Sequence, residues 1–131
     1  MNTENSKIVF PELSYAITGI IFDVHNNLGR YCNEEQYADA IARILQEKGM
    51  VCEREKVLPP SFDGEAKGSN MVDFLIENKV VLELKAKRML TREDYYQVRR
   101  YLGALDFKLG LLINFRDKYV RPRRILNSGV S

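Results

Sequence analysis

Two apolar runs in the middle of the chain, Met71 to Ile76 and Val80 to Leu84, constrain its fold more than any other feature. Only the polar tip 77–79 separates them, and two such runs joined by a short turn predict a β-hairpin. Successive residues of a strand point to opposite faces of a sheet, and here both faces are largely apolar. We therefore expect both strands to lie inside a sheet that helices cover on both sides.

The segments around the hairpin predict three helices and two further strands. The helices are expected over 13–28, over 33–48 and from residue 91, and the strands over 50–58 and 109–115. Asn33 with Gln36, and Thr91 with Asp94, have the spacing of helix capping boxes. The order α, α, β, β, β, α, β predicts a mixed α/β fold with a central mixed sheet flanked by helices.

The composition fits one globular domain over residues 1–131, with a polar tail at 1–10 and a basic tail at 118–131. Apolar residues make up 45% of the chain and charged residues 29%, which is typical of a protein with an ordinary core. No apolar run has the length of a membrane span, and the N-terminus lacks the pattern of a secretory signal. We therefore expect a cytoplasmic protein without a membrane partner.

Cysteine and histidine content argues against a zinc site. Cys32 and Cys52 lie far apart and outside any paired motif, and His25 is the single histidine. The net charge of +2 says little about nucleic acid, although basic residues cluster after the hairpin.

Charged residues interrupt the apolar hairpin strands. Glu83 and Lys85 are two residues apart and so project from one face of the second strand. With a three-residue tip, Asp73 lies opposite Glu83 and joins them on that face. A two-residue tip would instead place Asp73 opposite Leu84, on the other face. Charges in a buried strand are costly unless they are paired or bound to a metal.

Two carboxylates and a lysine on one face fit the chemistry of phosphodiester cleavage. The carboxylates are suitable ligands for a hard divalent cation such as Mg²⁺ or Mn²⁺, which polarises a phosphoryl oxygen and lowers the pKa of a bound water. Lys85 would orient or deprotonate that water, or stabilise developing charge. The same spacing also fits a structural salt-bridge cluster with Lys85 between two acids, and the spacing alone leaves both interpretations open.

Four segments together resemble the bacterial GxxExxY protein family, which is assigned to the PD-(D/E)xK nuclease superfamily. They are residues 24–29 followed by Glu34 and Tyr37, residues 73–86, the pair Gln97 and Tyr101, and residues 110–115. The resemblance extends from about residue 17 to residue 125.

The resemblance implies a restriction-endonuclease-like fold and a metal-dependent nuclease. The carboxylates of Asp73 and Glu83 would bind the metal, with the backbone carbonyl of Leu84 as a further ligand and Glu34 as an accessory acid near the metal. Lys85 would be the catalytic lysine.

Gln97 and Tyr101, four residues apart on one helical face, match the Q-x-x-x-Y element that lies beside the active site in related nucleases. The resemblance implies that Gln97 takes part in catalysis and that Tyr101 contacts the nucleic acid. The chain also departs from the family at two positions. The first glycine of the family motif falls at Tyr31, and an arginine often found two residues before the core aspartate is Met71. Both departures bear on which substrate the protein accepts, and neither changes Asp73, Glu83 or Lys85.

We therefore expect a Mg²⁺- or Mn²⁺-dependent nuclease whose substrate is nucleic acid, with DNA expected. Four basic residues would approach its phosphates, which would make binding weaker at high salt: Arg88, Arg92, Arg99 and Arg100. The alternative is a catalytically inactive nuclease-fold binding or interaction module, because a near-neutral chain of 131 residues leaves little surface for a DNA groove. Action as a homodimer also stays open.

Overall fold

The computed structural model describes residues 9–127, which form a five-stranded sheet with helices on both faces. The spatial order of the strands follows the sequence, and every neighbouring pair is antiparallel except β3 and β4, which are parallel. The strands are β1 (Cys52–Val57), β2 (Met71–Ile76), β3 (Val80–Lys85), β4 (Leu109–Asn114) and β5 (Arg123–Leu126). Both hairpin strands, β2 and β3, are interior to the sheet, as predicted.

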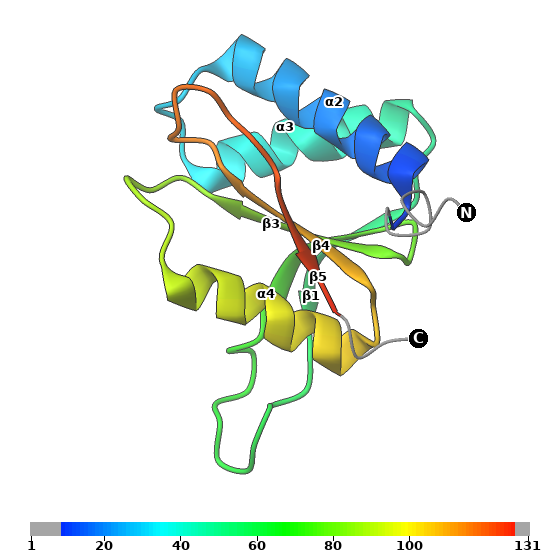
Figure 1. Cartoon of the computed structure of the whole chain (residues 1–131), viewed down its shortest axis with the longest axis vertical. Helices are drawn as coiled ribbons and strands as arrows, with labels where there is room; N and C mark the ends of the chain where they lie inside the picture. Colours follow the sequence, from blue (N-terminus) through cyan, green and yellow to red (C-terminus); the bar gives the residue numbers. More distant parts are fainter. Residues whose placement is uncertain (1–8, 128–131) are drawn as a thin grey trace, which may run out of the picture.

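Three helices cover the two faces of the sheet (Figure 1). Helices α2 (Pro11–Leu28) and α3 (Glu34–Glu47) pack on one face, where their apolar side chains join Phe74, Leu82 and Ile113 in one cluster. Helix α4 (Arg92–Leu105) packs on the other face, with Val81 and Leu112. The architecture is the mixed α/β fold that the sequence predicts. Across residues 9–127, no helix combines the length and apolar character that a membrane crossing requires.

Both predicted capping boxes are present and define where α3 and α4 begin. Asn33 accepts a hydrogen bond from the Gln36 N–H at 2.8 Å, and Gln36 accepts one from the Asn33 N–H at 2.9 Å. The Asp94 carboxylate accepts a hydrogen bond from the Thr91 N–H at 2.7 Å. These bonds satisfy N–H groups that a helix start leaves without a partner.

The hairpin has the three-residue tip that brings Asp73 to Glu83. Ile76 pairs with Val80, and the backbone ladder continues only to the pair Phe74 and Leu82. The next residue of β2 is Asp73, where the regular alternation of faces breaks: Phe74 packs in the α2–α3 cluster, yet Val72 packs in the α4 cluster. The first acid of the candidate site therefore lies where β2 separates from β3.

The segment predicted as a basic tail contains the fifth strand. Ile125 pairs with Gly110 and is buried, so residues 123–126 extend the sheet beyond β4. Helix α4 packs closely over the same part of β4. A Cβ at Gly110 would lie 2.5 Å from the Val98 Cγ1 atom, so this strand position requires glycine for contact with the helix.

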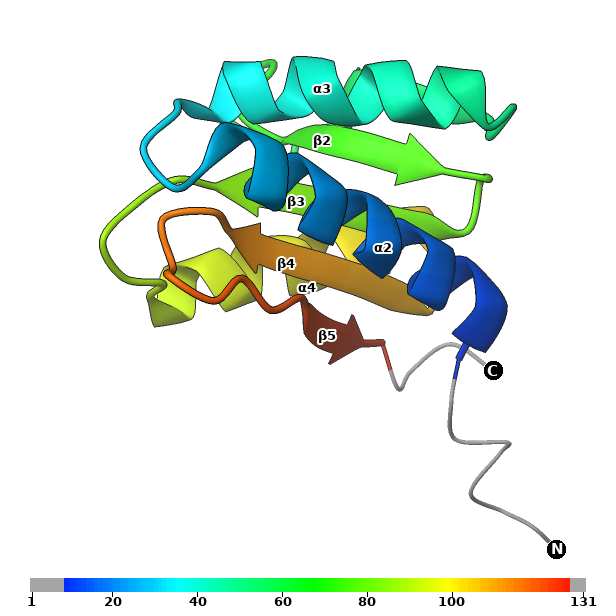
Figure 2. The same cartoon turned by 90° about the horizontal axis from the view of Figure 1, so that it is seen from above.

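The parallel strands β3 and β4 end at the same edge of the sheet. The α2–α3 turn, the β3–α4 connection and the β4–β5 loop gather at that edge (Figure 2). Lys85 and Asn114 are register partners there, which places the lysine of the candidate site at the end of β3, among these three loops.

Candidate active site

Asp73 and Glu83 meet where the backbone pairing of β2 and β3 stops. The Asp73 N–H donates to Glu83 Oε1 at 2.7 Å, and the Leu84 N–H donates to Asp73 Oδ2 at 2.8 Å. Each carboxylate therefore accepts a backbone hydrogen bond from the opposite strand, which leaves one oxygen of each without that bond.

The two carboxyl groups resist ionisation together. Glu83 is only 3% exposed, and burial, followed by the nearby charge of Asp73, raises its pKa to about 8. Burial also raises the pKa of Asp73; the bond from the Leu84 N–H opposes this shift, and the charge of Glu34 adds to it. Two adjacent carboxylates in a poorly solvated site disfavour a second negative charge. The pair therefore retains a proton at neutral pH when no cation is nearby.

Lys85 completes the cluster from the end of β3. Its Nζ donates to Gln97 Oε1 at 2.9 Å and lies 4.0 Å from Glu83 Oε2. Gln97 reaches the lysine from α4, on the face of the sheet opposite α2 and α3. The structure thus brings four of the predicted site residues into one connected group: Asp73, Glu83, Lys85 and Gln97.

Asp94, predicted from the sequence only as a helix cap, also belongs to this group. Its side chain is buried, and Oδ1 lies 3.8 Å from the Nζ of Lys85. Lys87 Nζ donates to both Asp94 oxygens, at 3.1 and 2.8 Å. Burial alone would raise the pKa of Asp94, but the bonds from Lys87 and Thr91 outweigh it and lower the pKa. The spacing of Asp94 three residues before Gln97, on one helical face, was the available signal.

Tyr101 does not fit its predicted role as a contact for nucleic acid. The ring is 1% exposed, and its hydroxyl donates to the backbone carbonyl of Met71 at 3.1 Å. Burial, and then the charge of Glu83, raises the pKa of Tyr101 to about 12. Tyr101 is therefore a neutral packing residue that supports β2 from behind the acidic pair.

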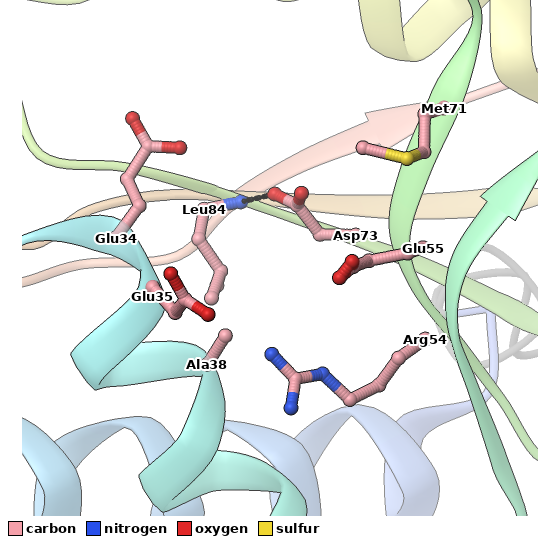
Figure 3. Close-up of a pocket in the computed structure, with 8 residues that line it drawn as sticks. All are labelled: Glu34, Glu35, Ala38, Arg54, Glu55, Met71, Asp73 and Leu84. Atoms are coloured by element: carbon pink, nitrogen blue, oxygen red, sulfur yellow. Dashed lines mark hydrogen bonds between the residues drawn. The ribbon is translucent and has the colours of Figure 1, made fainter. Parts of the chain in front are cut away.

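A cleft of about 300 Å³ opens beside Asp73 (Figure 3). Helix α3 contributes Glu34 and Glu35 to its wall, and β1 contributes Arg54 and Glu55. Its other lining residues are Ala38, Met71, Asp73 and Leu84. The predicted accessory acid Glu34 therefore faces the same space as Asp73, and its charge acts on both acids of the pair. No motif in the sequence marked the two β1 residues, Arg54 and Glu55, as part of a site.

Within residues 9–127, no three acidic, cysteine or histidine side chains are arranged to hold a metal ion by themselves. The donors that the fold does offer are two adjacent carboxylates and backbone oxygens. Oxygen donors of this kind suit a hard divalent cation completed by water.

The four predicted phosphate-binding arginines are all exposed, but they do not share one surface. Arg88 lies in the β3–α4 connection, close in sequence to Lys85. Successive helical residues are rotated by about 100°, so Arg100 projects about 60° from Gln97, whereas Arg92 and Arg99 project about 140° and 200° from it. Arg92 and Arg99 therefore lie on a different flank of α4 from the candidate site.

Comparison with known proteins identifies the family. The family model for the PD-(D/E)XK nuclease superfamily matches residues 11–125, which covers most of the chain and every residue of the group described above. Searches among curated proteins and among solved structures gave no significant match. With this match over nearly all of the folded chain, the protein belongs to the PD-(D/E)XK nuclease superfamily.

Proposed function

We propose that this protein is a Mg²⁺- or Mn²⁺-dependent nuclease that hydrolyses phosphodiester bonds in DNA, and that it belongs to the GxxExxY branch of the superfamily. The observation that carries the proposal is the convergence of Asp73, Glu83 and Lys85 at the point where β2 and β3 separate. Membership of a nuclease superfamily gives this arrangement its chemical context.

The donor set supports a divalent cation between the strands. Asp73 Oδ1 and Glu83 Oε2 are the oxygens that accept no backbone bond from the opposite strand. The Lys85 carbonyl accepts from Phe115 on the β4 side, and successive peptide groups of a strand alternate in direction, so the Leu84 carbonyl is directed towards β2 and Asp73. We therefore assign Asp73, Glu83 and the Leu84 carbonyl as ligands, with Glu34 as an accessory acid.

The chain's own groups would share the work of hydrolysis around that cation. A bound Mg²⁺ or Mn²⁺ supplies Lewis acidity and a water of lowered pKa. Gln97 holds the Lys85 amine on the Glu83 side of the site, where the amine can orient the attacking water or stabilise charge on the phosphoryl oxygens. Tyr101 and the α4 packing keep the face behind Glu83 dry, which strengthens these charge interactions.

A second candidate function is an inactive binding module that retains the nuclease fold. It is favoured by one observation: the described residues 9–127 contain no three-acid cluster, so metal binding depends on a backbone carbonyl and water. This module and the nuclease make opposite predictions for cleavage.

Cleavage of labelled single-stranded DNA and of plasmid DNA in Mn²⁺ tests the proposal. Lys85→Met should abolish cleavage and leave the fold intact, because it keeps the length of the side chain and removes the amine. Lys67→Met is the matched control, since Lys67 is exposed in the β1–β2 loop. Cleavage by the wild type and by the control, but not by Lys85→Met, supports the nuclease. Equal rates for all three proteins would assign the activity to a contaminant and refute the proposal.

A further inference from the structure

An exposed aromatic ring stands beside the candidate site, at the turn between α2 and α3. Tyr31 is 76% exposed and precedes Glu34 by three residues. The turn is held by Tyr37, whose buried ring carries a hydroxyl that donates to the Gly29 carbonyl at 2.5 Å and accepts from the Cys32 N–H at 3.2 Å. The Tyr31 ring is therefore presented to solvent from an ordered turn.

Two arginines approach this ring. The Cζ atoms of Arg30 and Arg116 lie 5.3 and 5.6 Å from the centre of Tyr31, within the range of cation–π contact. Each arginine side chain binds the backbone of the other: Arg30 Nε donates to the Arg116 carbonyl at 2.8 Å, and Arg116 Nε donates to the Arg30 carbonyl at 3.1 Å. These bonds fasten the α2–α3 turn to the β4–β5 loop, so the three side chains form one unit.

Within the part of the chain that the structure describes, no carboxylate forms an ion pair with this unit. Among residues 9–127, neither Arg30 nor Arg116 takes part in a salt bridge. Arg54, by contrast, pairs with Asp39 at 2.9 Å. Among the described residues, Arg116 Nη1 and both Nη atoms of Arg30 donate to no protein acceptor. Two guanidinium groups with such donors beside an exposed ring suit a ligand that carries both phosphates and aromatic bases.

The unit also borders the candidate site. Arg116 Nη2 donates to the carbonyl of Ala86 at 3.4 Å, directly after Lys85. Glu34, three residues after Tyr31, lines the cleft beside Asp73. The turn and the loop that carry the unit lie at the edge where β3 ends (Figure 2).

We propose that Arg30, Tyr31 and Arg116 form a platform that binds single-stranded nucleic acid next to the scissile phosphate. One base stacks on Tyr31, and the neighbouring phosphates bind the two guanidinium groups. Bases inside a duplex are already stacked on each other and cannot reach the ring, so the platform selects a single strand. The proposal rests on the proposed nuclease function for its biological meaning, and Tyr31 occupies the position of the first glycine in the family motif that the sequence resembles.

A tryptophan reporter tests the stacking directly, because the chain contains no tryptophan. Tyr31→Trp is titrated with oligo(dU), oligo(U) and a duplex of equal length in EDTA, and Tyr15→Trp is the matched control on α2, where the native ring is 82% exposed. We expect saturable quenching of Tyr31→Trp by a single strand and little change with the duplex or the control. Quenching by either strand supports the platform, and the strand that quenches more strongly shows whether the platform prefers DNA or RNA. Equal quenching of both tryptophans would overturn it.

Affinity measurements on the otherwise native chain provide the second arm. By fluorescence anisotropy in EDTA, Tyr31→Ala should weaken single-strand binding by about tenfold, in line with the loss of one aromatic–base stack, while Tyr31→Phe should bind as the wild type does. Tyr15→Ala should leave binding unchanged. Wild-type affinity in Tyr31→Ala refutes the platform. Since neither arm uses metal or cleavage, a failed platform and a failed nuclease proposal give separate results.

Discussion

The Leu84 N–H donates to the Asp73 carboxylate at 2.8 Å, beyond the point where backbone pairing between their strands has ended. A side chain thus takes the place of the missing ladder bond, and Glu83 does the same for the Asp73 N–H. The backbone groups stay satisfied while the strands open, which creates room between two acids without leaving buried N–H groups unpaired.

The stability of the metal-free protein should fall as the pH rises from 5 to 8. The pKa of Glu83 is raised from 4.5 to about 8 in the folded chain, so between these values the folded state binds more protons than the unfolded state. The stabilising proton is fully present below pH 4.5 and is lost through pH 8, with a slope of at most about 1.4 kcal/mol per pH unit. Urea unfolding in EDTA at several pH values measures this slope. Glu83→Gln should flatten it, and an unchanged slope would contradict the burial argument.

Metal binding should release protons and strengthen as the pH rises from 6 to 8. A cation must displace the proton that Glu83 retains, because only the ionised carboxylate is a ligand. Calorimetric titration of Mn²⁺ in two buffers with different ionisation enthalpies gives the number of protons released. We expect a value near one at pH 6.5 and a smaller value at pH 8.5. Heats of binding that do not depend on the buffer at pH 6.5 would contradict the displacement of a proton from Glu83.

Replacing Lys87 by methionine should reduce both stability and turnover. Asp94 is buried and receives two bonds from Lys87, so the substitution leaves its charge poorly compensated. Because the Lys87 side chain is 38% exposed, we expect a cost of about 1–2 kcal/mol, below that of a fully buried pair. Without Lys87, the Asp94 carboxylate should draw the Lys85 amine away from Gln97. This displacement of Lys85 should lower kcat by a larger factor than it changes KM.

Two controls accompany the Lys87 variant. Lys56→Met removes an exposed pair with Glu53 and should cost less than about 0.5 kcal/mol. Lys87→Arg keeps the positive charge and should restore most of the turnover. If Lys87→Met matches the wild type in kcat, Asp94 has no influence on the position of Lys85.

Gly110→Ala should destabilise the protein by about 1–3 kcal/mol, because its new Cβ would lie 2.5 Å from Val98 Cγ1 and force α4 away from β4. Gly103→Ala is the matched control. It lies in α4, and apart from its chain neighbours and the backbone of its own helix no atom lies within 4 Å of the new Cβ, so it should stabilise the helix by about 0.5–1 kcal/mol. Thermal unfolding of both variants checks the difference in sign. Equal changes in the unfolding temperature of the two variants would contradict a close contact between Gly110 and Val98.

The sequence predicted those parts of the structure that depend on local patterns. The register of the hairpin followed from the three-residue tip between Ile76 and Val80, and both helix starts followed from their capping boxes. These features involve residues within a few positions of each other, so spacing alone determines them.

The remaining features depend on contacts between distant segments. Strand β5 was predicted as part of a basic tail because every charged residue from position 118 onward is lysine or arginine. It forms by pairing with β4, and Ile125 is its buried residue. Tyr101 was expected to face a ligand, whereas the position of α4 over the sheet buries it. Arg116 meets Tyr31 only because the fold joins segments 85 residues apart, and no local pattern signals that contact.

Calorimetric titration of Mn²⁺ at pH 7.5 tests the central claim, that Asp73 and Glu83 form a cation site where β2 and β3 separate. Wild type and Asp23→Asn, a matched control at an exposed position of α2, should bind one equivalent or more with equal affinity. Asp73→Asn keeps the size of the side chain but loses a charged ligand, and it should bind at least tenfold more weakly. Absence of saturable binding by the wild type, or equal binding by Asp73→Asn, would contradict the account.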